Sequence, residues 1–123
     1  MMTDFAKLMN DYFVKYLAGQ KGSGSNTMKT YRDTFVQLLE FMDEKKHIRA
    51  DCIEVDSFSY DIINEFLEYL EKEKGVSIST RNNRLAAIRS FFKYTGYHEP
   101  KYLNISASIR EISKKKTEGR QMN

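Results

Sequence analysis

The feature that most constrains this chain is a series of apolar side chains at helical spacing, interrupted at only a few points. Proline occurs once, at Pro100, and the glycines cluster where the periodic segments end. Apolar residues make up 41% of the 123 residues and aromatic residues 13%, which is enough for a buried core in one domain. The pattern therefore predicts a single all-α domain.

Four long segments and one short segment carry the helical period, so we expect a bundle of four helices plus a short fifth. A glycine-rich loop over residues 18–25 follows the first segment, and residues 47–57 lack the period, although residues 52–58 fit a short extended stretch. The expected helices are residues 4–17, 25–46, 59–75, 77–96 and a short one from residue 104, with N-caps at Ser25 or Asn26, Ser59 or Asp61, Ser77 or Ser79, and Asn104, and with stops at Gly75 and Gly96.

Cysteine and histidine are too scarce for a disulfide or a structural zinc site. Cys52 is the single cysteine, and we expect it to be half-buried and inert. The N-terminus lacks a basic stretch followed by an apolar core, and no apolar run is long enough to span a membrane. The sequence thus predicts a cytoplasmic protein with no cofactor, no metal and no membrane partner.

Charge is distributed unevenly along the chain, although the net charge is only +3. Residues 1–74 hold ten Lys+Arg and 14 Asp+Glu, whereas residues 75–123 hold ten Lys+Arg and three Asp+Glu. The third helix places its acids on its outer side, at Asp61, Glu65, Glu68 and Glu71, which is typical of a solvated face. The basic half is typical of a region that meets phosphate or an acidic protein.

The stretch from Ser77 to Tyr97 has four basic residues and no acidic one. On a helical wheel of about 100° per residue, Leu85, Ile88 and Phe92 form the inner face. The opposite face carries small, amide, hydroxyl and cationic groups, which suit phosphate oxygens and base edges: Ser79, Asn83, Ala86, Ala87, Ser90, Lys93 and Tyr94, with Asn82 and Arg84 on its flanks. A helix-favouring alanine pair beside solvated cations explains the same face without a ligand, so this helix alone leaves both interpretations open.

In order along the chain, SNTMKTYRDTFVQLLEFM, INEFLEYLEKEKG, STRNNRLAAIRSFFKYTGY and NISASIREISKKK resemble the N-terminal core-binding domain of phage-integrase-type tyrosine recombinases. The likeness runs from about residue 5 to residue 116. The T-x3-Y-x3-F spacing at Thr27, Tyr31 and Phe35 and the NRLAAIRSFFKY segment are its most specific parts. The resemblance implies a SAM-like helical domain that forms half of a clamp around double-stranded DNA and positions a separate catalytic domain.

The resemblance also implies which residues contact DNA, on the two helices that begin near residues 25 and 79. We expect Arg81 to reach phosphate only from the helix end, because it lies nearer the core, and Arg89 to serve packing or an ion pair. The first helix would contact other recombinase protomers in a synaptic complex, while the isolated domain is expected to be monomeric. The expected DNA contacts are Ser25, Asn26, Thr27, Lys29, Thr30, Thr80, Arg81, Asn83, Arg84, Ala87, Ser90 and Lys93.

No catalytic residue of such a recombinase is recognisable in the chain. The family's chemistry needs two arginines, a lysine, histidines and a nucleophilic tyrosine, and neither His47 nor His98 lies in an H-x-x-R motif. The tyrosines have structural explanations, with Tyr12, Tyr16 and Tyr31 on apolar stripes and Tyr60, Tyr69 and Tyr94 partly exposed. We therefore expect a core-binding domain over residues 1–113 and a basic linker over residues 114–123 towards a catalytic domain. The alternative is a small helical protein-interaction domain whose basic face binds an acidic partner.

Overall fold

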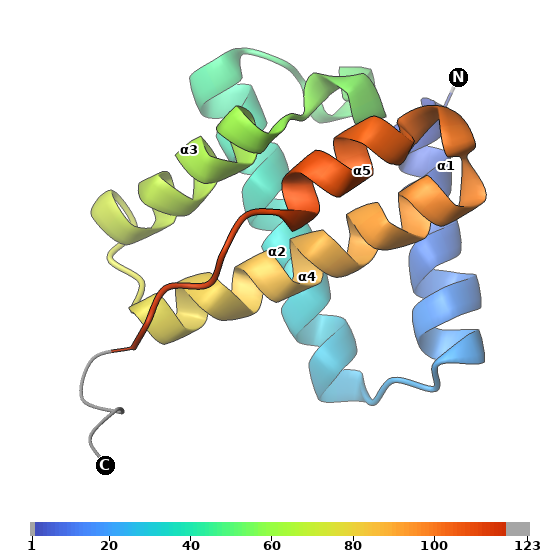
Figure 1. Ribbon diagram of the computed structural model, residues 1–123, viewed down its shortest axis with the longest axis horizontal. Helices are drawn as coiled ribbons and strands as arrows, with labels where there is room; N and C mark the ends of the chain where they lie inside the picture. The colour runs from blue at the N-terminus through green and yellow to red at the C-terminus, as the bar shows by residue number, and fades with distance from the viewer. Residues whose placement is uncertain (1, 118–123) are drawn as a thin grey trace.

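The computed structural model describes residues 2–117, and all regular structure within that range is helical, as predicted (Figure 1). Residues 118–123 of the expected linker lie outside the described residues. The chain after α5, residues 111–117, is called the tail below. The helices are α1 (Asp4–Asp11) with a π-helical continuation (Tyr12–Gln20), α2 (Ser25–Lys46), α3 (Tyr60–Lys72), α4 (Ile78–His98) and α5 (Leu103–Arg110), with single 3₁₀ turns at Ala50–Cys52, Val55–Ser57 and Pro100–Tyr102.

The first two helices begin and end close to the predicted points, with differences at their caps. The first helix continues through π-helical turns to residue 20, three residues beyond the expected end, so the loop shortens to residues 21–24. Gly24 occupies the N-cap of α2 without a side-chain hydrogen bond. The predicted caps Ser25 and Asn26 are therefore wrong, because both residues are already helical.

Residues 47–58 form two 3₁₀ turns rather than the extended stretch that the sequence predicted. His47 ends α2 in the left-handed region, at φ 59°. Cys52 is exposed at the end of the first turn, so the expectation of a half-buried thiol is wrong. Val55 and Phe58 anchor the second turn in the core.

Helices α3 and α4 start at predicted serine caps. The Ser59 and Ser77 hydroxyls accept hydrogen bonds from the Ile62 and Thr80 amides at 3.1 and 3.0 Å. Gly75 lies just beyond α3 at φ +68°, a conformation that favours glycine. Gly96, by contrast, does not end its helix, since α4 continues to residue 98.

Gly96 instead allows α4 and α5 to pack closely. It is buried, and a Cβ built on it would lie 2.7 Å from the Cβ of Ser106 on α5. The predicted cap at Asn104 is also wrong, because Tyr102 precedes the first residue of α5. The Tyr102 hydroxyl donates to Asp4, which joins the turn before α5 to the start of α1.

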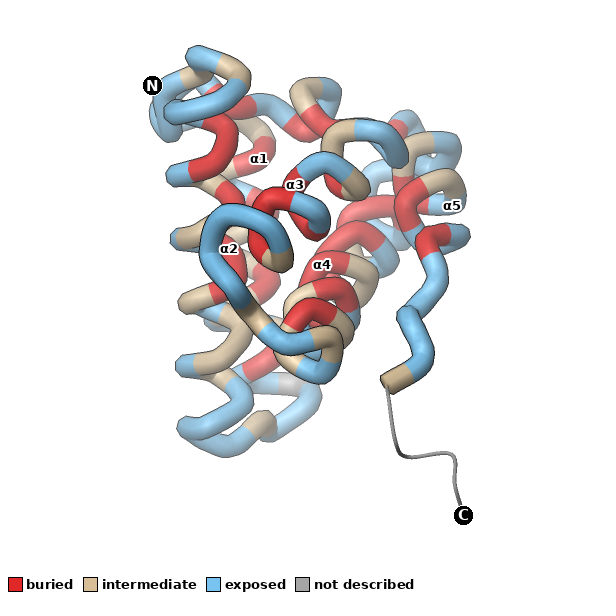
Figure 2. Tube along the Cα trace, turned by 90° about the vertical axis from the view of Figure 1, so that its left-hand side faces the viewer, coloured by how far each residue is buried: buried red, intermediate tan, exposed pale blue. Residues whose placement is uncertain are grey.

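An aromatic core with Phe91 of α4 at its centre holds the bundle together. The Phe91 ring lies 5.4–5.6 Å, centroid to centroid, from the rings of Phe5, Tyr12 and Phe35. Buried residues follow the sides of the helices that face one another (Figure 2). Because α4 contacts α2, α3 and α5, its exposed face is limited to one strip.

Candidate nucleic-acid interface

The two faces of α4 were predicted correctly except at one edge. Leu85, Ile88 and Phe92 are fully buried, and Ser79, Asn83, Ala86 and Lys93 are exposed. The prediction that Ala87 lies on the outer face is wrong, because that residue is fully buried.

The N-terminal helix contacts α4 just beyond Ala87, at Ser90 and Phe91. The Tyr12 ring contacts Phe91, one turn after Ala87, and its hydroxyl donates to Ser90 at 2.7 Å. This edge of α4 is therefore covered, and the half-buried Ser90 hydroxyl already has a partner within the protein.

The arginines in the first half of α4 make contacts within the protein. Arg81 is only 5% exposed, and its guanidinium donates to the Ser113 carbonyl at 3.0 Å. Burial lowers the pKa of Arg81, while the nearby Glu71 carboxylate opposes that shift. The predicted position near the core is confirmed, but a buried side chain with these contacts does not fit the expected role at phosphate.

Arg84 links α4 to α2. Its Nη1 atom lies 3.3 Å from the Thr30 carbonyl and 3.3 Å from the Thr34 hydroxyl. The side chain is half-buried, so only part of it faces solvent. Arg89 is also half-buried, and within residues 2–117 it takes part in no ion pair.

The start of α2 presents polar side chains to solvent. Ser25, Asn26 and Thr27 are exposed, and the Gly24 cap leaves their side chains free of any capping role. Lys29 is exposed too, although its ammonium lies 3.0 Å from the Asp33 carboxylate one turn later. Part of its charge is therefore compensated within α2.

Two shallow grooves connect these residues across elements. The first lies between α2 and α4, and the second lies between α4 and the tail. Asn83 lines both grooves, and no carboxylate lines either of them. The first is lined by Asn26, Thr27, Thr30, Tyr31, Asn83 and Ala86, and the second by Ser79, Asn82, Asn83, Lys114, Lys115, Lys116 and Thr117.

The sequence interpretation missed Asn82 as a residue that organises this surface. Its side-chain amide donates to the Lys115 carbonyl at 2.7 Å and accepts from the Lys115 amide at 2.9 Å. No local pattern indicates this pair, because its two members are far apart in the sequence. Thr80, which the sequence predicted as a DNA contact, is half-buried beside the cap of α4.

Three of the tyrosines, Tyr12, Tyr69 and Tyr94, are buried or half-buried. Burial is the main cause that raises the pKa of Tyr12, Tyr69 and Tyr94, and a phenol with a raised pKa is a weaker nucleophile at neutral pH. Tyr69 is buried and donates to Glu44 at 3.1 Å, so its predicted partial exposure is wrong. The Tyr94 ring lies 4.2 Å from the His98 ring, centroid to centroid.

Within residues 2–117, no group of three or more His, Cys, Asp or Glu side chains is arranged to hold a metal ion. In the same range, no helix combines the length and the apolar character needed to cross a bilayer.

Comparison with known proteins identifies relatives over most of the chain. The protein y4rC of Sinorhizobium fredii, which is named as an integrase/recombinase, is 34% identical over 107 residues, covering 87% of this chain and 31% of its own. The tyrosine recombinase XerC of Natranaerobius thermophilus is 30% identical over 104 residues, covering 85% and 33%. The chain thus spans about a third of the length of these relatives. No solved structure matches it significantly.

A family model locates the likeness within the chain. Residues 11–96, from the end of α1 to the close-packed glycine of α4, match the model of the phage integrase N-terminal SAM-like domain. That domain is the N-terminal part of tyrosine recombinases and is separate from their catalytic domain. This chain belongs to the phage integrase N-terminal SAM-like domain family.

Proposed function

We propose that the domain binds double-stranded DNA through one continuous surface. The surface combines the start of α2, the exposed strip of α4 and the tail lysines, and we call it the DNA-facing surface. Asn83 carries the proposal, because it lines both grooves and so joins the three segments. The members are Ser25, Asn26, Thr27, Lys29, Thr30, Ser79, Asn83, Ala86, Lys93, Lys114 and Lys116.

The chemistry of this surface suits a polyanion. Amide and hydroxyl groups bind phosphate oxygens and base edges, and lysines bind phosphate. Ala86 is small and exposed in the middle of the strip, so the α4 backbone can approach a groove of the duplex closely. The absence of carboxylates from the grooves avoids repulsion of the DNA backbone.

In the full-length protein, the domain would act as one half of a clamp around core-type recombination sites. The other half would be a catalytic domain that breaks and rejoins DNA during integration or recombination. The family assignment supports this role, and the polar surface supplies the means. With DNA as its ligand, the protein would act in the cytoplasm.

A titration of duplex DNA at several salt concentrations tests the proposal. The affinity of the unaltered domain should fall steeply as salt rises, because phosphate contacts release counterions. Lys93→Ala should reduce the slope of log K against log salt by about 0.9, the value for one lost phosphate contact. Lys72→Ala is the matched control, since this exposed lysine lies on α3, and its slope should not change.

Two results would contradict the proposal. One is a domain that fails to bind DNA even at low salt. The other is an equal loss for Lys93→Ala and Lys72→Ala, which would mean that no particular face is used. Binding to an acidic protein in the absence of DNA binding would instead support a protein-interaction domain.

The domain also has an apolar groove, apart from the two polar ones. It lies between the first helix and α2, where Val14 is 60% exposed and Val36 is 48% exposed. Phe13 and Met28 continue the apolar lining. We propose that this groove contacts another protomer when several copies assemble on DNA.

Sedimentation velocity tests the protomer contact. The isolated domain should remain monomeric across a range of concentrations, and assemblies should form only on DNA that holds several copies. Val36→Asp should reduce that assembly while leaving the affinity of a single copy for DNA unchanged. Assembly that is unaffected by Val36→Asp would exclude the groove as the contact.

A further inference from the structure

The tail does not leave the domain freely. After α5 it continues back along the first half of α4 (Figure 1). Arg81 donates to the Ser113 carbonyl at 3.0 Å, and two residues later the Asn82 side chain pairs with both backbone groups of Lys115, at 2.7 and 2.9 Å. Three hydrogen bonds therefore fix the backbone of the tail against α4.

A charged cluster on the α3 side of the tail accompanies these hydrogen bonds. The Glu71 carboxylate on α3 accepts from the Lys115 ammonium at 2.9 Å and lies 3.7 Å from the Arg81 Nε atom. Arg81 also donates to the Asn82 side-chain oxygen at 2.9 Å, which orients the amide towards the tail. We call Glu71, Arg81, Asn82, Ser113 and Lys115 the tail clamp, because they join α3, α4 and the tail.

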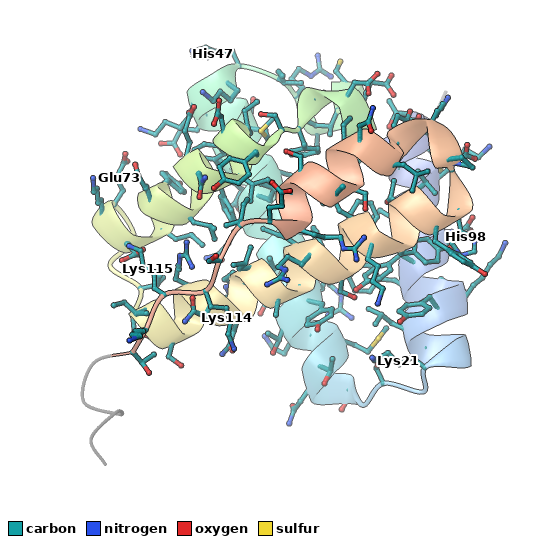
Figure 3. The ribbon with its side chains drawn as sticks, in the orientation of Figure 1. Lys21, His47, Glu73, His98, Lys114 and Lys115 are labelled. Atoms are coloured by element: carbon teal, nitrogen blue, oxygen red, sulfur yellow. The ribbon has the colours of Figure 1, made fainter. Side chains whose placement is uncertain are left out.

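The tail clamp determines where the neighbouring lysines lie. Lys115 faces α3, where it meets Glu71, whereas Lys114 lies on the α4 side of the tail (Figure 3). Lys114 and Lys116 are exposed, line the groove beside Ser79 and Asn83, and take part in no ion pair within residues 2–117. A freely moving tail would lose rotational and conformational entropy on binding, which a clamped tail has already given up.

We propose that Asn82 is a positioning residue, which fixes the tail so that Lys114 and Lys116 join the DNA-facing surface. This inference rests on the proposed function, because it assumes DNA as the ligand. Asn82 acts through the two lysines and through the path of the backbone. The backbone of residues 113–115 consequently has a fixed path beside the bound duplex.

Amide hydrogen exchange tests the clamp without DNA. The Lys115 amide should be protected in the unaltered domain and should exchange faster in Asn82→Ala, because its acceptor is lost. Asn82→Asp keeps an acceptor for this amide but loses the donor to the Lys115 carbonyl, so it should retain only part of the protection. Asn83→Ala is the matched control, as this neighbouring asparagine makes no hydrogen bond to the tail, and Lys115 protection should persist. An unprotected Lys115 amide, or one that is insensitive to Asn82→Ala, would overturn the clamp.

Salt-dependent DNA binding then tests the positioning role. Asn82→Ala should lower the slope of log K against log salt by up to about 1.8, the value for two phosphate contacts at about 0.9 each. In a Lys114→Ala/Lys116→Ala background, Asn82→Ala should change the slope no further, because the lysines through which it acts are absent. Equal effects in both backgrounds would overturn the positioning role.

The two measurements separate the inference from the proposed function. A domain that binds no DNA but shows Asn82-dependent Lys115 protection would overturn the proposed function and the DNA role of the lysines, while supporting the clamp. A domain that binds DNA with an unprotected tail would support the proposed function and overturn the clamp.

Discussion

Helices α3 and α4 share one core but present opposite charges to solvent. Both begin at a serine cap, and both bury phenylalanine and leucine at helical spacing. The exposed side of α3 carries Asp61, Glu65 and Glu68, whereas α4 has no acidic residue. Because burial constrains only the inner faces, the outer faces are free to differ. With DNA as the proposed ligand, we expect these charges to orient the domain with α3 away from the duplex.

Acids of α3 and of the residues just beyond it also pair with lysines of α2. Glu65 lies 2.5 Å from the Lys46 ammonium of α2, and Glu73 just beyond α3 lies 3.2 Å from Lys45. These lysines are therefore paired on the side of the domain that we expect to face away from DNA. The cations around the first half of α4 are divided differently, since Arg81 and Arg84 contact protein. Lys114 and Lys116 of the tail face solvent.

The largest expected effect tests the shared core. Phe66→Ala on α3 and Phe92→Ala on α4 should each lower the free energy of unfolding by about 3–5 kcal/mol, because both rings are fully buried and truncation leaves a cavity. Urea unfolding measures both losses. If either variant lost less than about 1 kcal/mol of unfolding free energy, α3 and α4 would not contribute equally to the core.

A smaller loss of stability should occur at the close contact between α4 and α5, which α3 has no counterpart for. Gly96→Ala should lower the free energy of unfolding by about 1–3 kcal/mol, because the added methyl would clash with Ser106. Adding Ser106→Gly should relieve the clash, so that the double variant is more stable than the sum of the two single changes predicts. Simple additivity in thermal melts would show that the two positions do not meet.

Local patterns predicted the helices and most of the α4 strip, and the errors have physical causes. Apolar spacing and the Ser59 and Ser77 caps are properties of neighbouring residues, so they were visible in the sequence. The burial of Ala87 depends on which elements pack around α4, and these come from other parts of the sequence. The role of Gly96 likewise depends on α5, which no pattern around this residue indicates.

The candidate site was less predictable than the fold for the same reason. Charge composition located the basic region, but it did not separate arginines that hold the protein together from lysines that face solvent. Arg81 became buried because α3 supplies Glu71 and the tail supplies the Ser113 carbonyl. Such partners come from distant parts of the chain, and only the folded arrangement brings them together.

Opposite charge changes on α3 and α4 test the orientation directly. Asn83→Glu places a carboxylate in both grooves, so DNA affinity should fall by about tenfold, or about 1.4 kcal/mol. Glu68→Lys adds a cation to the outer side of α3, where salt screens it from the duplex, and affinity should change by less than about twofold. Fluorescence anisotropy at fixed salt measures both. A larger gain for Glu68→Lys than the loss for Asn83→Glu would place the DNA on α3.

The smallest expected stability effect separates the two kinds of cation. Arg84→Ala should lower the free energy of unfolding by about 1 kcal/mol, because the Thr30 carbonyl and the Thr34 hydroxyl lose a donor between α2 and α4. Lys93→Ala should change it by less than about 0.5 kcal/mol, since that side chain is exposed. Urea unfolding and DNA binding are measured for both variants. Together they show whether each cation contributes to stability or to DNA affinity. If Arg84→Ala were as stable as the unaltered domain but bound DNA as weakly as Lys93→Ala, Arg84 would belong to the DNA-facing surface, and the division between internal arginines and external lysines would be wrong.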